Sequence, residues 1–398
     1  MNAASPYIWA KPGWPVFTLR PDALTGPLGR ARLAQGTVLG MAHALGLERH
    51  PEILQDIWVG EAMATAGIEG EKLNLEAVRS SVLRKLGFGK PGASPRNVDG
   101  LVDVMDDAAR NFGGKLTHAR LCNWQAALFP TGRSGLARIE VGKYRTHVDP
   151  MQIVSGRPGK EKAHYTAPPS AQVHAEMTRF LAWFRDSAPG GKISIDGLVR
   201  AAIAHLWFES IHPFEDGNGR IGRALCDMAL AQDANAPSRI VSLSRQLHEN
   251  RSQYYDQLNA AERGGLDVTD WVVWFAGQFE QACNRSASII RAAVDKAHFW
   301  RAAPQMNERQ KKVVQKLLDA GAGGFEGRMS AGKYGRITGA SKATATRDLS
   351  DLTEKGVLEI TGQGRGTRYW IAGTARGERG GAVRGIRASQ KTMRITGS

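Results

Sequence analysis

Apolar residues recur three and four positions apart along most of the chain, a spacing that is typical of amphipathic helices. The pattern therefore predicts a mostly α-helical protein. The helices expected in its first three hundred residues cover 24–47, 52–86 (two helices joined near 67–74), 101–112, 116–129, 196–210, 242–258 and 269–299, with another beginning near Arg220.

One part of this region has strand character. Residues 151–155 and 163–167 flank the turn-rich string G-R-P-G-K-E-K. Short runs around such a connector predict a β-hairpin.

The last hundred residues predict a different arrangement, in which short helices are followed by two strands. Helices are expected at 306–320, 330–337 and 341–355, and strands at 357–361 and 367–371 around the turn G-Q-G-R-G. Three helices followed by a hairpin resemble a winged helix-turn-helix. The resemblance makes the third helix the recognition helix and the hairpin the wing, and such modules bind nucleic acid or dock proteins and partner copies.

Five side chains of this module are candidates for a nucleic-acid surface. Lys342, Thr344 and Arg347 belong to the predicted recognition helix, and Arg365 and Arg368 to the wing. These residue types suit phosphate contacts better than base readout.

The positive net charge of the chain favours a polyanionic partner. The chain has 398 residues and 53 Lys and Arg against 38 Asp and Glu, a net charge of +15. Nucleic acid, a nucleotide or a membrane surface would each suit this balance. The three cysteines are far apart, which argues against a disulfide framework or a zinc site. No stretch has the length and hydropathy of a membrane span or a signal peptide, so we expect a cytoplasmic protein.

The candidate chemistry is concentrated in residues 211–223, which read I-H-P-F-E-D-G-N-G-R-I-G-R. Apolar periodicity on both sides makes this string a loop between two helices. Gly217, Asn218 and Gly219 form a turn at a helix N-terminus, where backbone N–H groups can bind an anion. Arg220 and Arg223 share one face of the second helix and can bind phosphate oxygens.

Two further residues of the loop suit catalysis. Asp216 precedes the turn, where a carboxylate can hold Mg²⁺ between phosphates. His212 opens the loop and can take a proton from an attacking hydroxyl. The string therefore predicts a site for a nucleotide polyphosphate and a metal.

The string from His212 to Arg223 resembles the complete signature of the Fic family. The resemblance implies a helical core that transfers AMP from ATP onto a Ser, Thr or Tyr hydroxyl of a protein, with His212 as general base and Asp216 as the Mg²⁺ ligand. Gly219 stands where phosphorylating relatives usually carry lysine, which favours adenylyl transfer. The choice of ATP over other nucleotides rests on this resemblance.

A second string, upstream of this motif, also resembles a segment of the Fic family. T-A-G-I-E-G, from Thr65 to Gly70, resembles the family's inhibitory helix, here expected at about 52–70. The resemblance implies that Glu69 pairs with Arg223 and repels the γ-phosphate, so that ATP binds in a non-productive pose.

Resemblance also assigns roles to two other segments. The hairpin beginning after Gly142-Lys143-Tyr144-Arg145 would be a flap, along whose edge the target lies as an added strand. The string N-R-S-Q-Y-Y resembles a segment near the nucleotide base, which makes Asn250 and Tyr254 candidate adenine contacts.

Together these observations predict four regions: an N-terminal helical domain (1–114) with the inhibitory helix, a Fic core (115–300), a winged helix-turn-helix (301–373) and a disordered basic tail (374–398). Three functions are carried forward: a self-inhibited adenylyltransferase acting on a protein target and on itself, a DNA-binding regulator that uses the Fic site as a nucleotide sensor, and a hydrolase that removes AMP. DNA is a candidate partner, and a homodimer is among the options for assembly.

Overall fold

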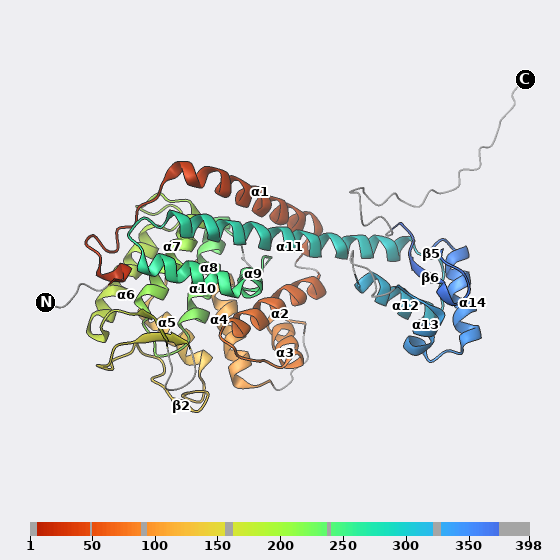
Figure 1. Cartoon of the computed structure of the whole chain (residues 1–398), viewed down its shortest axis with the longest axis horizontal. Helices are drawn as coiled ribbons and strands as arrows, with labels where there is room; N and C mark the ends of the chain where they lie inside the picture. Colours follow the sequence, from red (N-terminus) through yellow and green to blue (C-terminus); the bar gives the residue numbers. More distant parts are fainter. Residues whose placement is uncertain are drawn as a thin grey trace, which may run out of the picture. The chain divides into compact units, whose positions relative to one another are not determined.

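The computed structural model describes residues 6–47, 50–88, 94–155, 162–236, 240–320 and 328–373. The chain divides into two compact units, one ending at Ile290 and the other beginning at Arg291. The described part contains fourteen α-helices and three two-stranded antiparallel sheets (Figure 1). The prediction of a mostly α-helical protein with a short β-hairpin is therefore confirmed.

The first unit contains most of the helices. Their bounds are α1 Pro21–Leu45, α2 Pro51–Ile68, α3 Leu75–Leu86, α4 Arg96–Arg110, α5 His118–Leu128, α6 Ser170–Asp186, α7 Gly197–Ile211, α8 Asn218–Ala234, α9 Leu243–Glu249 and α10 Arg251–Arg263, with a short 3₁₀ turn η1 at Ile8–Ala10. Helix α11, Thr269–Ala302, spans the division between the units.

The structure differs from the predicted helices at two places. The single helix expected at 242–258 is broken into α9 and α10 at Asn250, whose amide donates to the carbonyl of Gln246 at 3.0 Å and so ends α9. Helix α6 was not predicted from the sequence.

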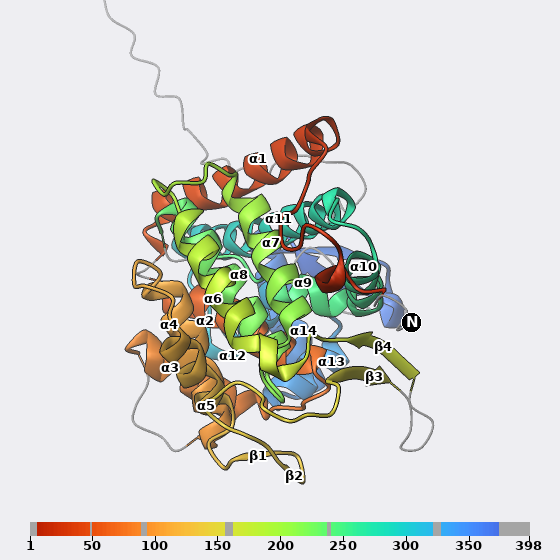
Figure 2. The same cartoon turned by 90° about the vertical axis from the view of Figure 1, so that its left-hand side faces the viewer.

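Helix α7 is the centre of the first unit. Every one of its residues is buried, including the polar Arg200, His205 and Glu209, and its apolar residues are spread around the helix, as in helices at the centre of a fold. Helix α8 packs along it (Figure 2). Asp196 caps α7 by accepting from the N–H groups of Leu198 and Val199 at 2.8 and 3.2 Å, which fixes where the helix starts.

Strands occur as small hairpins. β3 (Gln152–Ser155) pairs with β4 (Lys162–Thr166), with Gln152 opposite Thr166 and Ile153 opposite Tyr165. This is the predicted flap hairpin. A smaller hairpin, β1 (Arg133–Ser134) with β2 (Ala137–Arg138), was not predicted because two-residue strands leave no periodic signal.

The N-terminal region packs against the core within the unit that ends at Ile290. The ring of Trp14 lies edge-on against Trp207 of α7, with centroids 6.0 Å apart, and α2 packs against α9. The domain boundary expected at residue 114 stays a prediction.

The second unit follows the predicted order of elements. It comprises α12 Glu308–Asp319, α13 Ala331–Thr338, α14 Lys342–Glu354, β5 Leu358–Thr361 and β6 Arg368–Ile371, with a 3₁₀ turn η3 at Gly364–Gly366. Val313, Tyr334 and Leu349 bring the three helices together in a buried core with the hairpin. The tail predicted at 374–398 lies outside the described residues.

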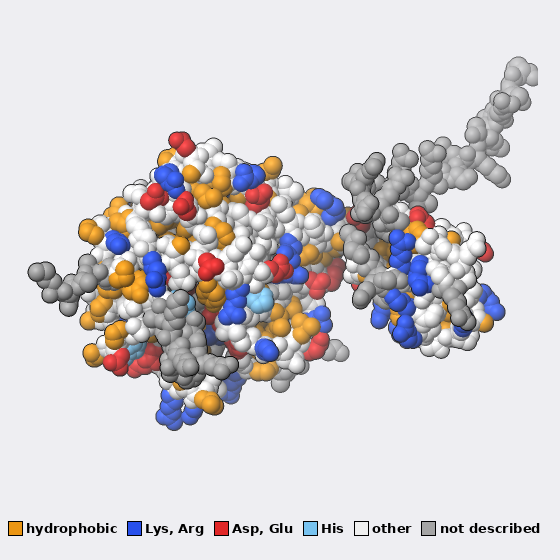
Figure 3. Space-filling model, viewed as in Figure 1, with side chains coloured by type: hydrophobic (Ala, Val, Ile, Leu, Met, Phe, Trp, Pro, Cys, Tyr) orange, Lys and Arg blue, Asp and Glu red, His pale blue; other side chains and the backbone are white. Residues whose placement is uncertain are grey.

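Two further observations concern the basic side chains on the surface and the hydropathy of the helices. Lys and Arg side chains gather in a column on the face of the second unit that Figure 3 shows. Among the described helices, none combines the length and the hydropathy needed to cross a bilayer.

Candidate functional site

Two consecutive helices hold the loop that carries the motif. Helix α7 ends at Ile211 and α8 begins at Asn218, so the loop spans 212–217. His212 and Gly217 have left-handed backbone conformations, with φ of 49° and 92°, and these let the chain turn sharply at both ends of the loop. Because α7 is buried along its whole length, the loop has a rigid base.

Two buried side chains fix the backbone of this loop. Asn218 accepts from the N–H of Phe214 at 2.9 Å and donates to its carbonyl at 2.8 Å. Arg145 donates from Nε to the carbonyl of His212 at 2.8 Å, and its backbone N–H donates to the carbonyl of Pro213 at 2.9 Å. The side chain of Asn218 therefore holds the loop, while phosphate binding by the backbone N–H groups of the turn stays a prediction. Sequence reasoning missed this role of Arg145, whose partner lies 67 positions away.

His212 is in the state that a general base requires. Its side chain is 14% exposed, and burial, with Arg145 acting in the same direction, lowers its pKa to about 4. The imidazole is therefore neutral at pH 7 and can accept a proton. Its Nδ1 lies 3.8 Å from Oε2 of Glu209 on α7. Burial raises the pKa of Glu209 to about 8, so this carboxyl is mostly protonated at pH 7.

Asp216 presents a partly exposed carboxylate beside the turn. Ser134 of the β1–β2 hairpin donates a hydrogen bond to its Oδ2, and the N–H of Gly217 donates to Oδ1 at 2.5 Å. The guanidinium of Arg220 lies 3.8 Å from Oδ1. The side chain is 39% exposed, so an oxygen ligand for a cation is available at this point. Ser134 was missed from the sequence because it lies 82 positions away.

Arg223 is 3% exposed, and its partners come from the end of α2. Nε donates to Oγ1 of Thr65 at 2.7 Å, while Nη2 donates to Oε1 of Glu69 at 2.7 Å and to the carbonyl of Thr65 at 3.0 Å. Burial raises the pKa of Glu69, but the charge of Arg223 outweighs it, and the pKa ends below its usual value. The predicted pair of Glu69 and Arg223 is thus present, and Gly70, with φ of 79°, follows it in the turn after α2.

Gly219 explains how Glu69 can come so close to α8. A Cβ on Gly219 would lie 2.2 Å from Oε1 of Glu69, so another residue there would displace the carboxylate. Gly219 belongs to the first turn of α8, whose backbone N–H groups lack partners within the helix and attract negative charge. Glu69 therefore occupies the position where the motif was predicted to hold phosphate.

A second carboxylate, which sequence reasoning missed, engages the other motif arginine. Oε2 of Glu71 accepts from Nη1 of Arg220 at 3.0 Å, and Asn97 of α4 donates to Oε1 of Glu71 at 3.1 Å. Arg220 is 8% exposed and lies over the ring of Phe129, 4.8 Å from its centroid. Both predicted phosphate-binding arginines are therefore paired with acidic side chains from one short segment.

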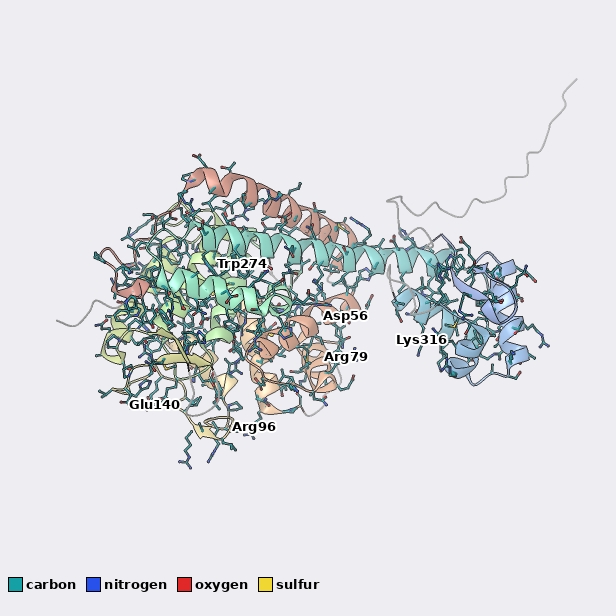
Figure 4. All side chains as sticks on the ribbon, in the orientation of Figure 1. Asp56, Arg79, Arg96, Glu140, Trp274 and Lys316 are labelled. Carbon is teal, nitrogen blue, oxygen red and sulfur yellow. The ribbon has the colours of Figure 1, made fainter. Side chains whose placement is uncertain are left out.

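An open cleft of about 650 Å³ lies over these groups. Glu69, Glu71, Asp216 and Arg220 line it, together with the β1–β2 hairpin. Arg96, at the start of α4, also lines it and is labelled in Figure 4. In the described part of the chain, no cluster of three His, Cys, Asp or Glu side chains could hold a metal unaided.

The two candidate adenine contacts are not brought to this cleft. Tyr254 is 1% exposed, and its hydroxyl hydrogen-bonds Nε2 of His205 at 2.7 Å in the interior. Asn250 uses its amide on Gln246 and on Gln278, at 3.0 and 3.3 Å. Neither residue lines the cleft over the motif. The structure thus assigns both side chains to packing between helices.

The candidate nucleic-acid residues lie on α14, on β6 and in the turn η3 of the second unit. Lys342 and Arg347 are exposed on α14, and Thr344 beside them is half-buried. Arg368, on β6, is also half-buried. Arg365 lies in the turn η3, and its side chain is outside the described part of the structure.

Comparison with known proteins identifies the domain around the motif. Residues 115–230 match the Fic/DOC family, and residues 7–88 match a domain of unknown function, DUF4172. The protein therefore contains a Fic domain, preceded by a region that recurs in other proteins without an assigned role.

Curated relatives are similar over part of their length. Protein adenylyltransferase fic-1 of Caenorhabditis elegans is 26% identical over 259 residues, which is 64% of this chain and 46% of that protein. A probable protein adenylyltransferase of Aquifex aeolicus is 32% identical over 108 residues, 27% of this chain and 30% of that protein. The chain spans about half the length of the curated fic-1 relatives it matches.

A solved structure shares the fold. The crystal structure of a Fic family protein from Desulfovibrio desulfuricans G20 superposes with a TM-score of 0.53 at 21% identity. The match covers 91% of this chain and 99% of that one.

The ion pair of Glu69 and Arg223 predicts a specific pH dependence of stability. Because the folded-state pKa of Glu69 is lowered, its contribution is present above the unfolded-state value and is lost as the pH falls through the folded-state value. Glu69→Gln should lower the free energy of unfolding by about 2 kcal/mol at pH 7, and the difference from wild type should shrink as the pH is lowered to 3.5. Urea unfolding at pH 7, 5 and 3.5 measures this.

Glu76→Gln is the matched control, because Glu76 pairs with Arg79 on the surface of α3 and is 75% exposed. Surface pairs contribute little, so this variant should follow wild type at each pH. A difference for Glu69→Gln that is equally large at pH 7 and pH 3.5 would contradict the assigned role of the ionised carboxylate.

Proposed function

We propose that the protein is an adenylyltransferase that transfers AMP from ATP to a hydroxyl side chain of a protein. One observation carries the proposal: His212, which is neutral and only 14% exposed, the Asp216 carboxylate and two arginines surround the N-terminus of α8, and Asp216 and Arg220 line an open cleft. This combination suits a nucleotide polyphosphate and a proton transfer. The Fic domain and the names of the curated relatives support the same reaction.

The proposed step requires one base and one leaving group. His212 takes the proton of the target hydroxyl, whose oxygen attacks the α-phosphorus of ATP. A new P–O bond forms, the bond from the α-phosphorus to the bridging oxygen breaks, and pyrophosphate leaves with that electron pair. Positioning and charge stabilisation by the α8 N–H groups and arginines would supply most of the rate enhancement.

Mg²⁺ fits the donor set at Asp216. The ion is typically held by one or two carboxylates together with substrate phosphates, so a single protein carboxylate facing the cleft is sufficient. When bound, the ion would neutralise charge on the phosphates. Ser134 and the N–H of Gly217 would hold the Asp216 carboxylate in position for it.

The resting protein is proposed to be self-inhibited. A distal phosphate of ATP must reach Arg223, and Glu69 already occupies that guanidinium at 2.7 Å. Glu71 similarly occupies Arg220 at 3.0 Å. Since both carboxylates follow directly from α2, displacement of this segment would free both arginines and remove two negative charges from the phosphate site.

Two alternatives start from the same site. In the first, Glu69 activates water and the protein removes AMP from a modified target. Loss of Glu69 would then abolish activity instead of raising it. In the second, ATP binding at the Fic site regulates the second unit, and the protein acts mainly on DNA.

DNA binding by the second unit is retained as a second function because α14 exposes Lys342 and Arg347 beside a β-hairpin. A helix that exposes a lysine and an arginine in its first half and is followed by a hairpin suits contacts to DNA phosphates. This function is compatible with the transfer reaction, since it uses other residues.

Removing the side chain of Glu69 should activate the transfer of AMP. With α-labelled ATP and Mg²⁺, Glu69→Gly should label itself and proteins of a cell extract at least tenfold more than wild type, because Arg223 becomes available to phosphate. Glu71→Gln should give a smaller increase, since it frees Arg220 alone. Adding His212→Ala to Glu69→Gly should remove the label. Gel electrophoresis with phosphorimaging measures this.

Two results would overturn the assignment. Equal labelling by wild type and Glu69→Gly would refute self-inhibition, and label that persists after His212→Ala would refute the base. If Glu69→Gly instead loses the ability to release AMP from a pre-labelled protein, the hydrolase is the better account.

DNA binding should depend on the two exposed basic side chains of α14, Lys342 and Arg347. Lys342→Ala combined with Arg347→Ala should weaken binding of a mixed-sequence 30-base-pair duplex at least tenfold and reduce the salt dependence of the affinity, because two phosphate contacts are lost. Fluorescence anisotropy at several salt concentrations measures both quantities. Lys312→Ala with Lys316→Ala on α12 is the control with the same change in charge. Equal effects of the two pairs would show attraction to net charge alone.

A further inference from the structure

Two buried polar residues precede the proposed base on helix α7. His205 is 0% exposed and Glu209 is 4% exposed, and His212 follows directly after the last residue of the helix. Positions 205, 209 and 212 are four and three residues apart, so their side chains lie along one face of α7. Polar groups buried in this way are normally hydrogen-bonded or serve a function. The three side chains therefore require a common explanation.

Helix α8 leaves space for two of these side chains at Gly222. A Cβ on Gly222 would lie 2.4 Å from Oε1 of Glu209 and 3.0 Å from Nδ1 of His205, so a larger residue there would displace both. Gly222 belongs to the motif string but not to its phosphate-binding turn. Its lack of a side chain lets the carboxyl of Glu209 and the imidazole of His205 approach the same point of α8.

The polar groups form a chain that leads from the site into the interior. Nδ1 of His212 lies 3.8 Å from Oε2 of Glu209, and Nε2 of His205 hydrogen-bonds the hydroxyl of Tyr254 at 2.7 Å. Among the described residues, Nδ1 of His212, Oε1 of Glu209 and Nδ1 of His205 are buried without a hydrogen-bond partner. Unpaired buried groups are costly, and catalytic hydrogen bonds are often long until substrate binds. The two carboxyl oxygens of Glu209 are therefore suited to pair with one imidazole on each side.

The protonation states allow such pairing. Burial raises the pKa of Glu209 to about 8. Burial, with Arg223 acting in the same direction, lowers the pKa of His205 to about 3. Both groups are therefore mostly uncharged at pH 7, and each offers one donor and one acceptor. In one order, Nδ1–H of His212 donates to Oε2 of Glu209, Oε1–H donates to Nδ1 of His205, and Nε2–H of His205 donates to Tyr254.

This order is the one that leaves His212 able to act as a base. Because Nδ1 of His212 is buried, a hydroxyl from outside can reach only Nε2. If the order were reversed, Nε2 would carry the proton and would have no lone pair for another. An ionised Glu209 would also be unfavourable, since a negative charge beside the ring raises the pKa of His212 and favours the imidazolium.

We propose that the side chain of Glu209, supported by His205 and Tyr254, holds a proton on Nδ1 of His212, so that Nε2 takes the proton of the target hydroxyl. Glu209 is thus a positioning residue that acts through His212. When Nε2 takes the proton, Nδ1–H of the imidazolium keeps its bond to Oε2 and no proton passes to the carboxyl. The role in transfer rests on the proposed transferase function, whereas the position of the proton on His212 does not.

The position of this proton can be measured without turnover. In ¹⁵N-histidine-labelled protein at pH 7, long-range ¹H–¹⁵N spectra should show His212 with its proton on Nδ1, and His212→Gln identifies its signals by their loss. Glu209→Gln should keep this tautomer, because its amide oxygen accepts from His212 and its N–H donates to His205. Glu209→Met has a similar length but no hydrogen-bonding carboxyl, and the proton should move wholly or partly to Nε2.

The rate of transfer should follow the tautomer. In a Glu69→Gly background, Glu209→Met should lower the maximal rate of self-labelling from α-labelled ATP at least tenfold, because a residue that holds the tautomer of a catalytic imidazole acts on the chemical step. The ATP concentration that gives half of this rate should stay within about twofold, and Glu209→Gln should recover most of the loss. Glu262→Met is the matched control. It removes another buried carboxyl, 1% exposed and with its pKa raised by burial, from α10, and should keep the rate.

Three results would overturn the proposal. An unchanged tautomer in Glu209→Met would show that the backbone carbonyl of Glu209, which also acts on the ring of His212, holds the proton alone. An equal loss of rate in the Gln and Met variants, or in Glu262→Met, would indicate damaged packing. A Glu69→Gly parent that labels nothing refutes the transferase, which is a separate failure, because the spectra still decide where His212 carries its proton.

Discussion

The buried guanidinium of Arg223 is the constraint on which the site depends. At 3% exposure it must be paired, and an unpaired buried charge would cost several kcal/mol. In the structure described, Thr65 and Glu69 supply the partners. A nucleotide phosphate could supply them instead. The same physical requirement therefore stabilises the fold through Glu69, and under the proposed self-inhibition it would also oppose ATP binding.

The region of unknown function reaches the Fic domain at two places. Its first residues contact β4 of the flap through Trp9. At the far end, Glu69 and Glu71 engage the motif arginines. One region therefore contacts both the flap and the arginines of the motif, and these contacts hold it against the rest of the first unit.

Prediction from sequence succeeded where information is local. The loop at 212–217, the helices on either side and the flap follow from periodicity and turn residues, and the pair of Glu69 and Arg223 followed from a family resemblance. Contacts between distant positions could not be predicted: Arg145 on His212, Ser134 on Asp216 and Glu71 on Arg220 depend on tertiary packing. Tyr254 could not be placed from the sequence, because an aromatic ring suits a helix interface as well as a nucleotide base, and the structure has it bonded to His205 in the interior.

The most direct measurement compares ATP with ADP binding by isothermal titration calorimetry, in His212→Ala to prevent turnover and in the same variant with Glu69→Gly. If Glu69 occupies the position of the γ-phosphate, removing it should strengthen ATP binding by about tenfold, or 1.4 kcal/mol, and ADP binding much less. An equal gain for both nucleotides would contradict the account, because the carboxylate would then oppose something other than the distal phosphate.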